Sequence, residues 1–227
     1  MEDVLAYGPL LAEGTGVTVM LAVLSLALAT ALGALGAAGR LSGWRAADWG
    51  VQGYTTLVRG VPDLVMILLI YFGGQRALNG AMEGLGLERV EVSKFAAGVL
   101  AIGFIYGGYL AETFRGAFVA IPRGQGEGGA ALGLSRLQVL WRVEMPQLIR
   151  LALPGYANVW MVLVKSTAVV SIIGLGDLVG LADKAGKSTR QQFWFYLAVL
   201  LVYLAITAVS DAALARAKAR ANRGVVA

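Results

Sequence analysis

Long apolar stretches without a single charged residue are the feature that most constrains this chain. The stretch from Thr15 to Ala38 contains no Asp, Glu, Lys or Arg. It is longer than the roughly 20 residues that a helix needs to cross the hydrocarbon core of a bilayer. The whole chain is 58% hydrophobic and only 15% charged, whereas a soluble domain carries about 25% charged residues. The sequence therefore predicts an all-α integral membrane protein.

Five predominantly apolar segments follow one another along the chain, which predicts five transmembrane helices. The second contains Arg59, Pro62 and Asp63, and a loop-like stretch over 74–92 separates it from the third. We find no internal repeat and no second domain, so residues 1–227 are expected to form a single transmembrane domain. The five spans are expected at about 15–38, 51–73, 94–114, 151–174 and 192–213.

The basic residues indicate how these spans are oriented. Five spans place the two termini on opposite sides of the membrane. With the N-terminus outside, 12 of the 19 basic residues are cytoplasmic and 6 are external, and Lys165 lies within a span. Cytoplasmic loops carry the excess of Lys and Arg, so we predict an N-out, C-in topology, in agreement with the acidic Glu2, Asp3 and Glu13. The loop over 115–150 is then cytoplasmic.

The composition also argues against several functions. The chain has no Cys and no His, so it lacks thiolate metal ligands and the commonest general base. We therefore expect neither an enzyme nor a metal or cofactor site. Nucleic-acid binding is not expected, because the basic residues collect on one side of the membrane. Gly186–Thr189 imitates the end of a phosphate-binding loop, but the Gly that such a loop requires five positions earlier is replaced by Leu181.

The cytoplasmic loop over 115–150 contains two segments long enough for a short helix. Pro122 ends the continuation of the third span. The first loop helix is expected over 125–132, with Glu127 in its first turn, where the helix dipole favours an anion. Gly133 is expected to end it in a left-handed cap.

The second loop helix is expected over 136–145, with Ser135 as its N-cap and Pro146 as its end. Leu137 and Trp141 fall on one face at four-residue spacing. Two short helices joined by a Gly can transmit a displacement from a soluble partner to the spans on either side. They can equally lie on anionic lipid as an amphipathic loop. The pattern alone leaves both open.

Small residues in the third span indicate close helix packing. Gly103, Gly107 and Ala111 recur at four-residue spacing, which lets two helix backbones approach each other. We predict that these three positions form a helix contact.

The cytoplasmic loop resembles a known motif. The run Glu127–Gly133, followed thirteen residues later by Pro146, is similar to the "EAA" loop of ABC-importer permeases. The chain departs from that pattern in having Gly128 and Gly129 in place of two Ala, and Met145 before the Pro.

Other segments narrow the resemblance, which covers nearly everything from Gly14 to Ser210. In order along the chain they resemble the Q-type membrane permeases of bacterial histidine and lysine/arginine/ornithine ABC importers. These segments are 54–65, 103–107, 112–118, Gly124–Gln125, 152–155, Lys165, Ser171 and 185–189.

The resemblance implies a multi-pass permease subunit in the bacterial inner membrane. It implies import of basic or polar amino acids such as histidine, arginine, lysine, ornithine or an opine, driven by ATP-Mg on a partner chain. The implied partners are a homologous permease forming a heterodimer, two ATPase subunits and a periplasmic amino-acid-binding protein. The residues implied to couple to the ATPase are Gln125, Glu127, Ala130, Leu132, Gly133, Leu137, Trp141 and Pro146.

Two charges inside the spans are candidates for the substrate pathway. Asp63 lies about 18 Å and Lys165 about 21 Å into their helices, at 1.5 Å per residue. Charges at such depth usually face a partner or a cavity. They either pair with each other, or Asp63 attracts a cationic amino acid while Lys165 or Asn158 meets its carboxylate.

Two other functions fit a polytopic membrane protein. A stand-alone ion-coupled transporter would hold substrate and ion sites in one chain, often with internal repeats, and none is visible. A non-transporting scaffold or sensor would not need Asp63 and Lys165 within the bilayer.

Overall fold

The computed structural model describes residues 6–222, and in that range the chain forms helices, turns and connecting segments without a strand. Glu2, Asp3 and Arg223, which entered the orientation argument, lie outside the described residues. Five helical segments are long and apolar enough to cross a membrane. The elements are α2 (Gly8–Leu41), α3 (Arg45–Gly60), α4 (Asp63–Leu68), the π-helical turn η1 (Leu69–Gly73), α5 (Gly74–Gly84), α6 (Lys94–Val119), α7 (Arg123–Ala131), α8 (Arg136–Val139), the π-helical turn η2 (Leu140–Glu144), α9 (Met145–Ser166), the 3₁₀ helix η3 (Thr167–Ile173), α10 (Leu178–Thr189) and α11 (Gln192–Ala221).

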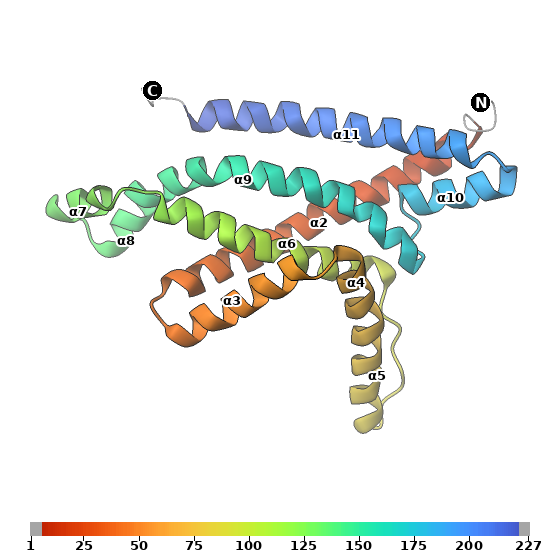
Figure 1. Cartoon of the computed structure of the whole chain (residues 1–227), viewed down its shortest axis with the longest axis horizontal. Helices are drawn as coiled ribbons and strands as arrows, with labels where there is room; N and C mark the ends of the chain where they lie inside the picture. The colour runs from red at the N-terminus through yellow and green to blue at the C-terminus, as the bar shows by residue number, and fades with distance from the viewer. Residues whose placement is uncertain (1–5, 223–227) are drawn as a thin grey trace.

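Four long helices, α2, α6, α9 and α11, run along the length of the molecule (Figure 1). Helix α2 packs most extensively on α6, and α6 also packs against α9. Helix α11 contacts α10 and α9. Helix α2 begins and α11 ends at opposite ends of the bundle (Figure 1), as expected for an odd number of crossings.

The α2–α6 contact is close because small residues of α6 lie against leucines of α2. A Cβ on Gly103 would lie 2.6 Å from the Leu28 side chain, and one on Gly107 would lie 2.8 Å from Leu32 Cβ. Ala111 is fully buried. The three small residues at four-residue spacing therefore all lie in the interior of the bundle.

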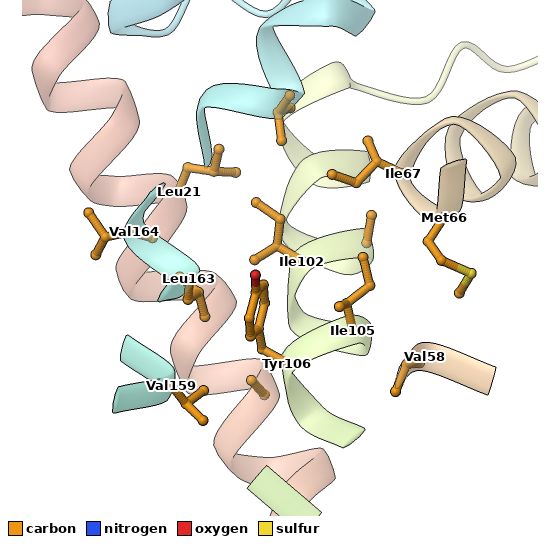
Figure 2. Close-up of a cluster of buried hydrophobic side chains, with 14 of the residues drawn as sticks. Leu21, Val58, Met66, Ile67, Ile102, Ile105, Tyr106, Val159, Leu163 and Val164 are labelled. Atoms are coloured by element: carbon orange, nitrogen blue, oxygen red, sulfur yellow. The ribbon is translucent and has the colours of Figure 1, made fainter. Parts of the chain in front are cut away.

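The hydrophobic core occupies the crossing of α2, α4, α6 and α9 (Figure 2). Leu21 of α2, Ile67 of α4, Ile102 and Ile105 of α6 and Leu163 of α9 are each at most 1% exposed. All five of these side chains are apolar, so close packing stabilises the core, including around the few polar groups within it.

The second span differs from the expected segment 51–73. Helix α3 ends at Gly60, and Val61 and Pro62 are extended, with ψ angles of 135° and 137°. Pro62 lacks an N–H and disfavours helical geometry at the residue before it, so the helix stops and a new one begins at Asp63. The segment long and apolar enough to span is Asp63–Gly84, and it projects steeply from the bundle (Figure 1).

The stretch expected as a loop over 74–92 is therefore partly helix α5. The chain returns along α5 and is fixed to it by side-chain amides. Gln75 accepts a hydrogen bond from the Val92 N–H at 2.7 Å, and Asn79 accepts one from the Val90 N–H at 3.0 Å. These bonds satisfy backbone groups of a segment that has no regular structure of its own.

The fourth span also begins earlier than the expected residue 151. Helix α8, the turn η2, α9 and η3 are continuous, and together they form the apolar segment Arg136–Ile173. The expected stop at Pro146 is wrong, because Pro146 occupies the first turn of α9 directly after η2. Proline is tolerated in a first turn, where its missing N–H need not find an intrahelical acceptor. The other three spans are longer than expected and cover Gly8–Leu41, Lys94–Val119 and Gln192–Ala221.

The turn before α10 contains a buried carboxylate. Asp177 is fully buried, and its Oδ1 accepts a hydrogen bond from the Gly180 N–H at 3.1 Å as the N-cap of α10. The Thr18 hydroxyl of α2 accepts a hydrogen bond from the Leu178 N–H at 3.1 Å. Burial raises the pKa of the Asp177 carboxyl to about 6, against the hydrogen bonds that lower it.

Candidate functional site

The first candidate site is the helical hairpin formed by α7, α8 and η2, which lies where α6 ends and α9 begins (Figure 1). Gly133 adopts a φ of +84°, and its N–H and that of Leu134 bond back to Ala130 and Gly129. This is the predicted left-handed C-cap. Ser135 caps α8, in a capping box with Gln138. Both predicted helix-end signals are confirmed.

The expected position of Glu127 in its helix is wrong. Helix α7 begins at Arg123, directly after Pro122, and its first turn contains no acidic residue. Glu127 is the fifth residue of α7, beyond the range in which the helix dipole acts most strongly on an anion. The prolyl ring of Pro122 sets the start two residues earlier than expected, because it fixes the chain just before a helix.

Glycines allow the two arms of the hairpin to approach. Gly129 is buried, and a Cβ there would lie 3.2 Å from a Val139 methyl. A Cβ on Gly126 would lie 3.0 Å from the Glu144 carboxylate. The Gln147 amide also donates to Gln125 across the hairpin at 3.4 Å. The apolar inner faces of the two arms therefore pack against each other within the hairpin.

The residues implied to couple to the ATPase are all exposed, seven in the hairpin and its connecting turn and Pro146 in the first turn of α9. Leu132 is 85% exposed and Trp141 61% exposed. Large apolar side chains exposed in this number on a small unit typically mark an interaction surface. The residues exposed here are Gln125, Glu127, Ala130, Leu132, Gly133, Leu137, Trp141 and Pro146.

The second candidate site surrounds Asp63, at the break between α3 and α4. The Tyr106 hydroxyl of α6 donates to Asp63 Oδ2 at 2.8 Å, and the Ser166 hydroxyl at the end of α9 donates to the same oxygen at 3.3 Å. Tyr106 is only 3% exposed and stands among the apolar side chains of the core (Figure 2). Three interrupted or crossing elements therefore meet at one carboxylate.

The expected Asp63–Lys165 ion pair is not formed. Asp63 makes its hydrogen bonds to Tyr106 and Ser166, and no ion pair of Asp63 occurs within residues 6–222. Lys165 and Asn158 are both exposed, on the face of α9 that points away from the core. Among the described residues, Asp63 therefore forms no ion pair with Lys165 and no hydrogen bond with Asn158. Sequence reasoning missed Tyr106 and Ser166, because neutral hydroxyls within apolar helices carry no signal of their own.

Charged residues near the expected cytoplasmic ends form a separate network. Arg115 contacts Glu112 at 2.8 Å, and Arg40 contacts Glu112 at 3.7 Å and Asp48 at 2.7 Å. These pairs join α2, α3 and α6.

The structure gives no sign of a metal or phosphate site among the described residues. No group of three or more acidic side chains converges there to hold a metal ion. Gly186–Thr189 are the last residues of α10, whereas a phosphate-binding loop precedes a helix.

Comparison with known proteins decides the family. Residues 29–223 match the family model described as "Binding-protein-dependent transport system inner membrane component". The chain belongs to this family. The permease is 44% identical over 219 residues to the histidine/lysine/arginine/ornithine transport system permease protein HisQ of Escherichia coli, and 96% of each chain is covered. It is 37% identical to the arginine ABC transporter permease protein ArtQ of E. coli, covering 94% of the permease and 95% of ArtQ.

The octopine transport system permease protein OccQ of Rhizobium radiobacter is 39% identical, over 94% of the permease and 90% of OccQ. The fold matches a crystal structure of an amino acid ABC transporter with histidines, with a TM-score of 0.81, 28% identity and 96% coverage of both chains. The permease is thus the inner-membrane subunit of an ABC importer, and the stand-alone ion-coupled alternative is set aside.

Proposed function

We propose that the permease imports basic amino acids: histidine, arginine, lysine, ornithine or a related opine. The observation that carries this proposal is that its relatives at 37–44% identity, over more than nine-tenths of the permease, are named for these substrates. The proposed assembly contains a second, homologous permease in a heterodimer, two ATPase subunits and a periplasmic amino-acid-binding protein. The permease binds no cofactor and catalyses no reaction, since ATP-Mg is used by the ATPase.

The proposed orientation is N-out and C-in, with residues 1–227 as one transmembrane domain. The excess of basic residues on the side of the α7–α8 hairpin supports it. Exposure of the eight coupling residues supports docking of the ATPase there. In this orientation α10 and the Asp177 turn face the periplasm.

The substrate pathway is proposed to run along the exposed face of α9. Pro154, Asn158, Val162 and Lys165 are exposed and spaced four, four and three residues apart, which places them on one helix face. Lysine at the centre of a bilayer costs about 2.5–3.5 kcal/mol on insertion scales. A face that carries Lys165 at this depth is therefore better explained by a partner permease and an aqueous path than by lipid.

Asp63 has one free oxygen that could serve this path. Its Oδ2 is occupied by Tyr106 and Ser166, while Oδ1 has no hydrogen bond within residues 6–222. A half-buried carboxylate with one oxygen fixed and the other open suits a cationic side chain. Asp63 attracts the cation, and Asn158 or Lys165 meets the carboxylate of the same amino acid.

The test is uptake by the reconstituted importer. Proteoliposomes containing both permeases and the ATPase, with the binding protein outside and ATP inside, should accumulate labelled arginine, lysine or histidine. Accumulation should persist when ionophores collapse all ion gradients. Uptake that follows an ion gradient and ignores ATP would contradict the mechanism, whereas ATP-driven uptake of neutral amino acids alone would contradict only the substrate class.

A further inference from the structure

An apolar pocket of about 480 Å³ lies between the C-terminal part of α2, the end of α6 and the η2–α9 junction. Its volume falls within the range of roughly 300–1,000 Å³ that ligand pockets occupy. Alanines of α2, Phe114 and Phe118 of α6, and Leu148 and Ile149 of α9 form most of the lining. None of the residues assigned above to ATPase coupling or to the substrate pathway lines this pocket.

The pocket offers almost nothing to a polar ligand. Thr30 and Ser42 are its polar lining residues, and both hydroxyls already donate to carbonyls of their own helix, at 2.7 and 2.8 Å. A stable water needs two to four polar partners. The occupant must therefore be a hydrocarbon.

The length of the pocket along α2 indicates which hydrocarbon occupant it suits. Its lining on α2 extends from Thr30 to Ser42, which is about 18 Å at 1.5 Å per residue. One leaflet contributes about 15 Å of hydrocarbon core. The length of the pocket therefore matches one extended acyl chain of a lipid in that leaflet.

One end of the pocket reaches the level of lipid headgroups. Ser42 follows the last residue of α2, and Trp44, exposed by 69%, comes two residues later. Tryptophan concentrates at membrane–water interfaces. Thr30 marks the opposite, deep end, where its hydroxyl lies 3.1 Å from that of Tyr156. The pocket therefore runs from the interface towards the middle of the membrane.

Two arginines lie close in sequence to lining residues at the interfacial end. Arg45 lies three residues beyond Ser42, and Arg142 lies between the lining residues Leu140 and Met145. Both are exposed, and neither forms an ion pair within residues 6–222. Nearby Arg40, in contrast, is paired with acidic groups. Basic sites between helices on the cytoplasmic side are suited to anionic lipid headgroups.

We propose that this pocket binds one acyl chain of an anionic phospholipid from the cytoplasmic leaflet, with the headgroup between Arg45 and Arg142. The lipid then connects the α2–α3 turn to η2, the π-helical turn through which the coupling hairpin enters α9. The proposal rests on the cytoplasmic orientation of the hairpin and not on which amino acid is imported.

The test counts lipids on the intact importer by native mass spectrometry, after exchange into detergent with equal phosphatidylglycerol and phosphatidylcholine. Wild type should retain phosphatidylglycerol on this subunit. Ala38→Phe, or the milder Ala38→Leu, fills the pocket from an exposed lining position and should remove one bound lipid. Ala27→Phe, at an exposed position of α2 outside the pocket, is the matched control and should retain it.

The headgroup is tested separately. Arg45→Gln with Arg142→Gln should reduce the preference for phosphatidylglycerol by roughly tenfold or more, since each surface cation contributes to anionic lipid binding. Arg123→Gln with Arg136→Gln, elsewhere on the hairpin, should leave it unchanged. Unaltered lipid counts in both Ala38 variants would overturn the acyl-chain site, and an unaltered preference in the Arg45/Arg142 pair would overturn the headgroup assignment. Neither readout depends on transport, so a failed substrate assignment gives a different result.

Discussion

Replacing Gly107 by Ala tests one of the close contacts between α2 and α6. The new Cβ would lie 2.8 Å from Leu32 Cβ of α2 and 2.7 Å from the Tyr54 hydroxyl of α3. The Leu32 Cβ is attached directly to the α2 backbone, so it cannot move aside as the end of a flexible side chain could. Helices α2 and α6 must then separate locally, and overpacking of this kind costs about 1–3 kcal/mol.

Alanine also favours a helix over glycine by about 0.8–1 kcal/mol, which would hide part of that cost. Gly116→Ala removes this ambiguity, because Gly116 lies on the same helix with nothing within 4 Å of a new Cβ. Both variants gain the same propensity, so the difference between them isolates the packing term. We expect Gly107→Ala to be less stable than Gly116→Ala by about 1–3 kcal/mol.

Reversible unfolding of the full chain by SDS in mixed micelles, followed by circular dichroism, measures this difference. A helix content equal to wild type before denaturant is added is the necessary control. If the two variants unfold at the same SDS fraction, the α2–α6 contact is looser than described, and Gly107 is not required for close approach.

The remaining predictions concern the hairpin, the topology and the turn before α10. Glu127→Lys reverses an exposed charge on α7, and we expect normal membrane insertion with loss of ATPase co-purification and of uptake; wild-type levels of both would contradict the coupling role. A reporter active only in the periplasm should work after Glu88 and fail after Gln138, and the opposite pattern would invert the orientation. Because burial raises the pKa of Asp177 to about 6, the native state binds this proton more tightly than the unfolded chain, so stability falls as pH rises from about 4 to 6. Asp177→Asn keeps the acceptor for the Gly180 N–H, and should match wild type at pH 4 yet exceed it by up to about 3 kcal/mol at pH 7; parallel stability curves would refute this.

The number of spans and the local helix signals were predictable because they depend on neighbouring residues. Hydropathy over a window identifies five apolar segments, and Gly133 and Ser135 act on the helix ends beside them. Hydropathy cannot place the break at Pro62, since an apolar window averages over the two extended residues Val61 and Pro62. Helix α5 was not predicted either. The segment that follows it is held against α5 by hydrogen bonds to Gln75 and Asn79, and a hydropathy window does not detect such contacts.

The Asp63–Lys165 pair failed as a prediction for a geometric reason. Depth in the membrane gives one coordinate of a side chain and says nothing of its direction around the helix axis. Ser166 faces Asp63, and Lys165, one residue earlier, is rotated from it by about 100°. Tyr106, which provides the actual partner, comes from a third helix whose azimuth the sequence does not define.

The unbroken helix from Arg136 to Ile173 has a mechanical consequence. Trp141, on the surface proposed to meet the ATPase, and Ser166, at the Asp63 carboxylate, belong to one rod. At 1.5 Å per residue the part from Pro146 to Ser166 is about 30 Å long, so a tilt of about 5° at the hairpin end displaces Ser166 by roughly 2.6 Å. That displacement is enough to break a hydrogen bond of 3.3 Å. A rotation of this helix as one body would therefore link movement of the hairpin to release of the Asp63 carboxylate.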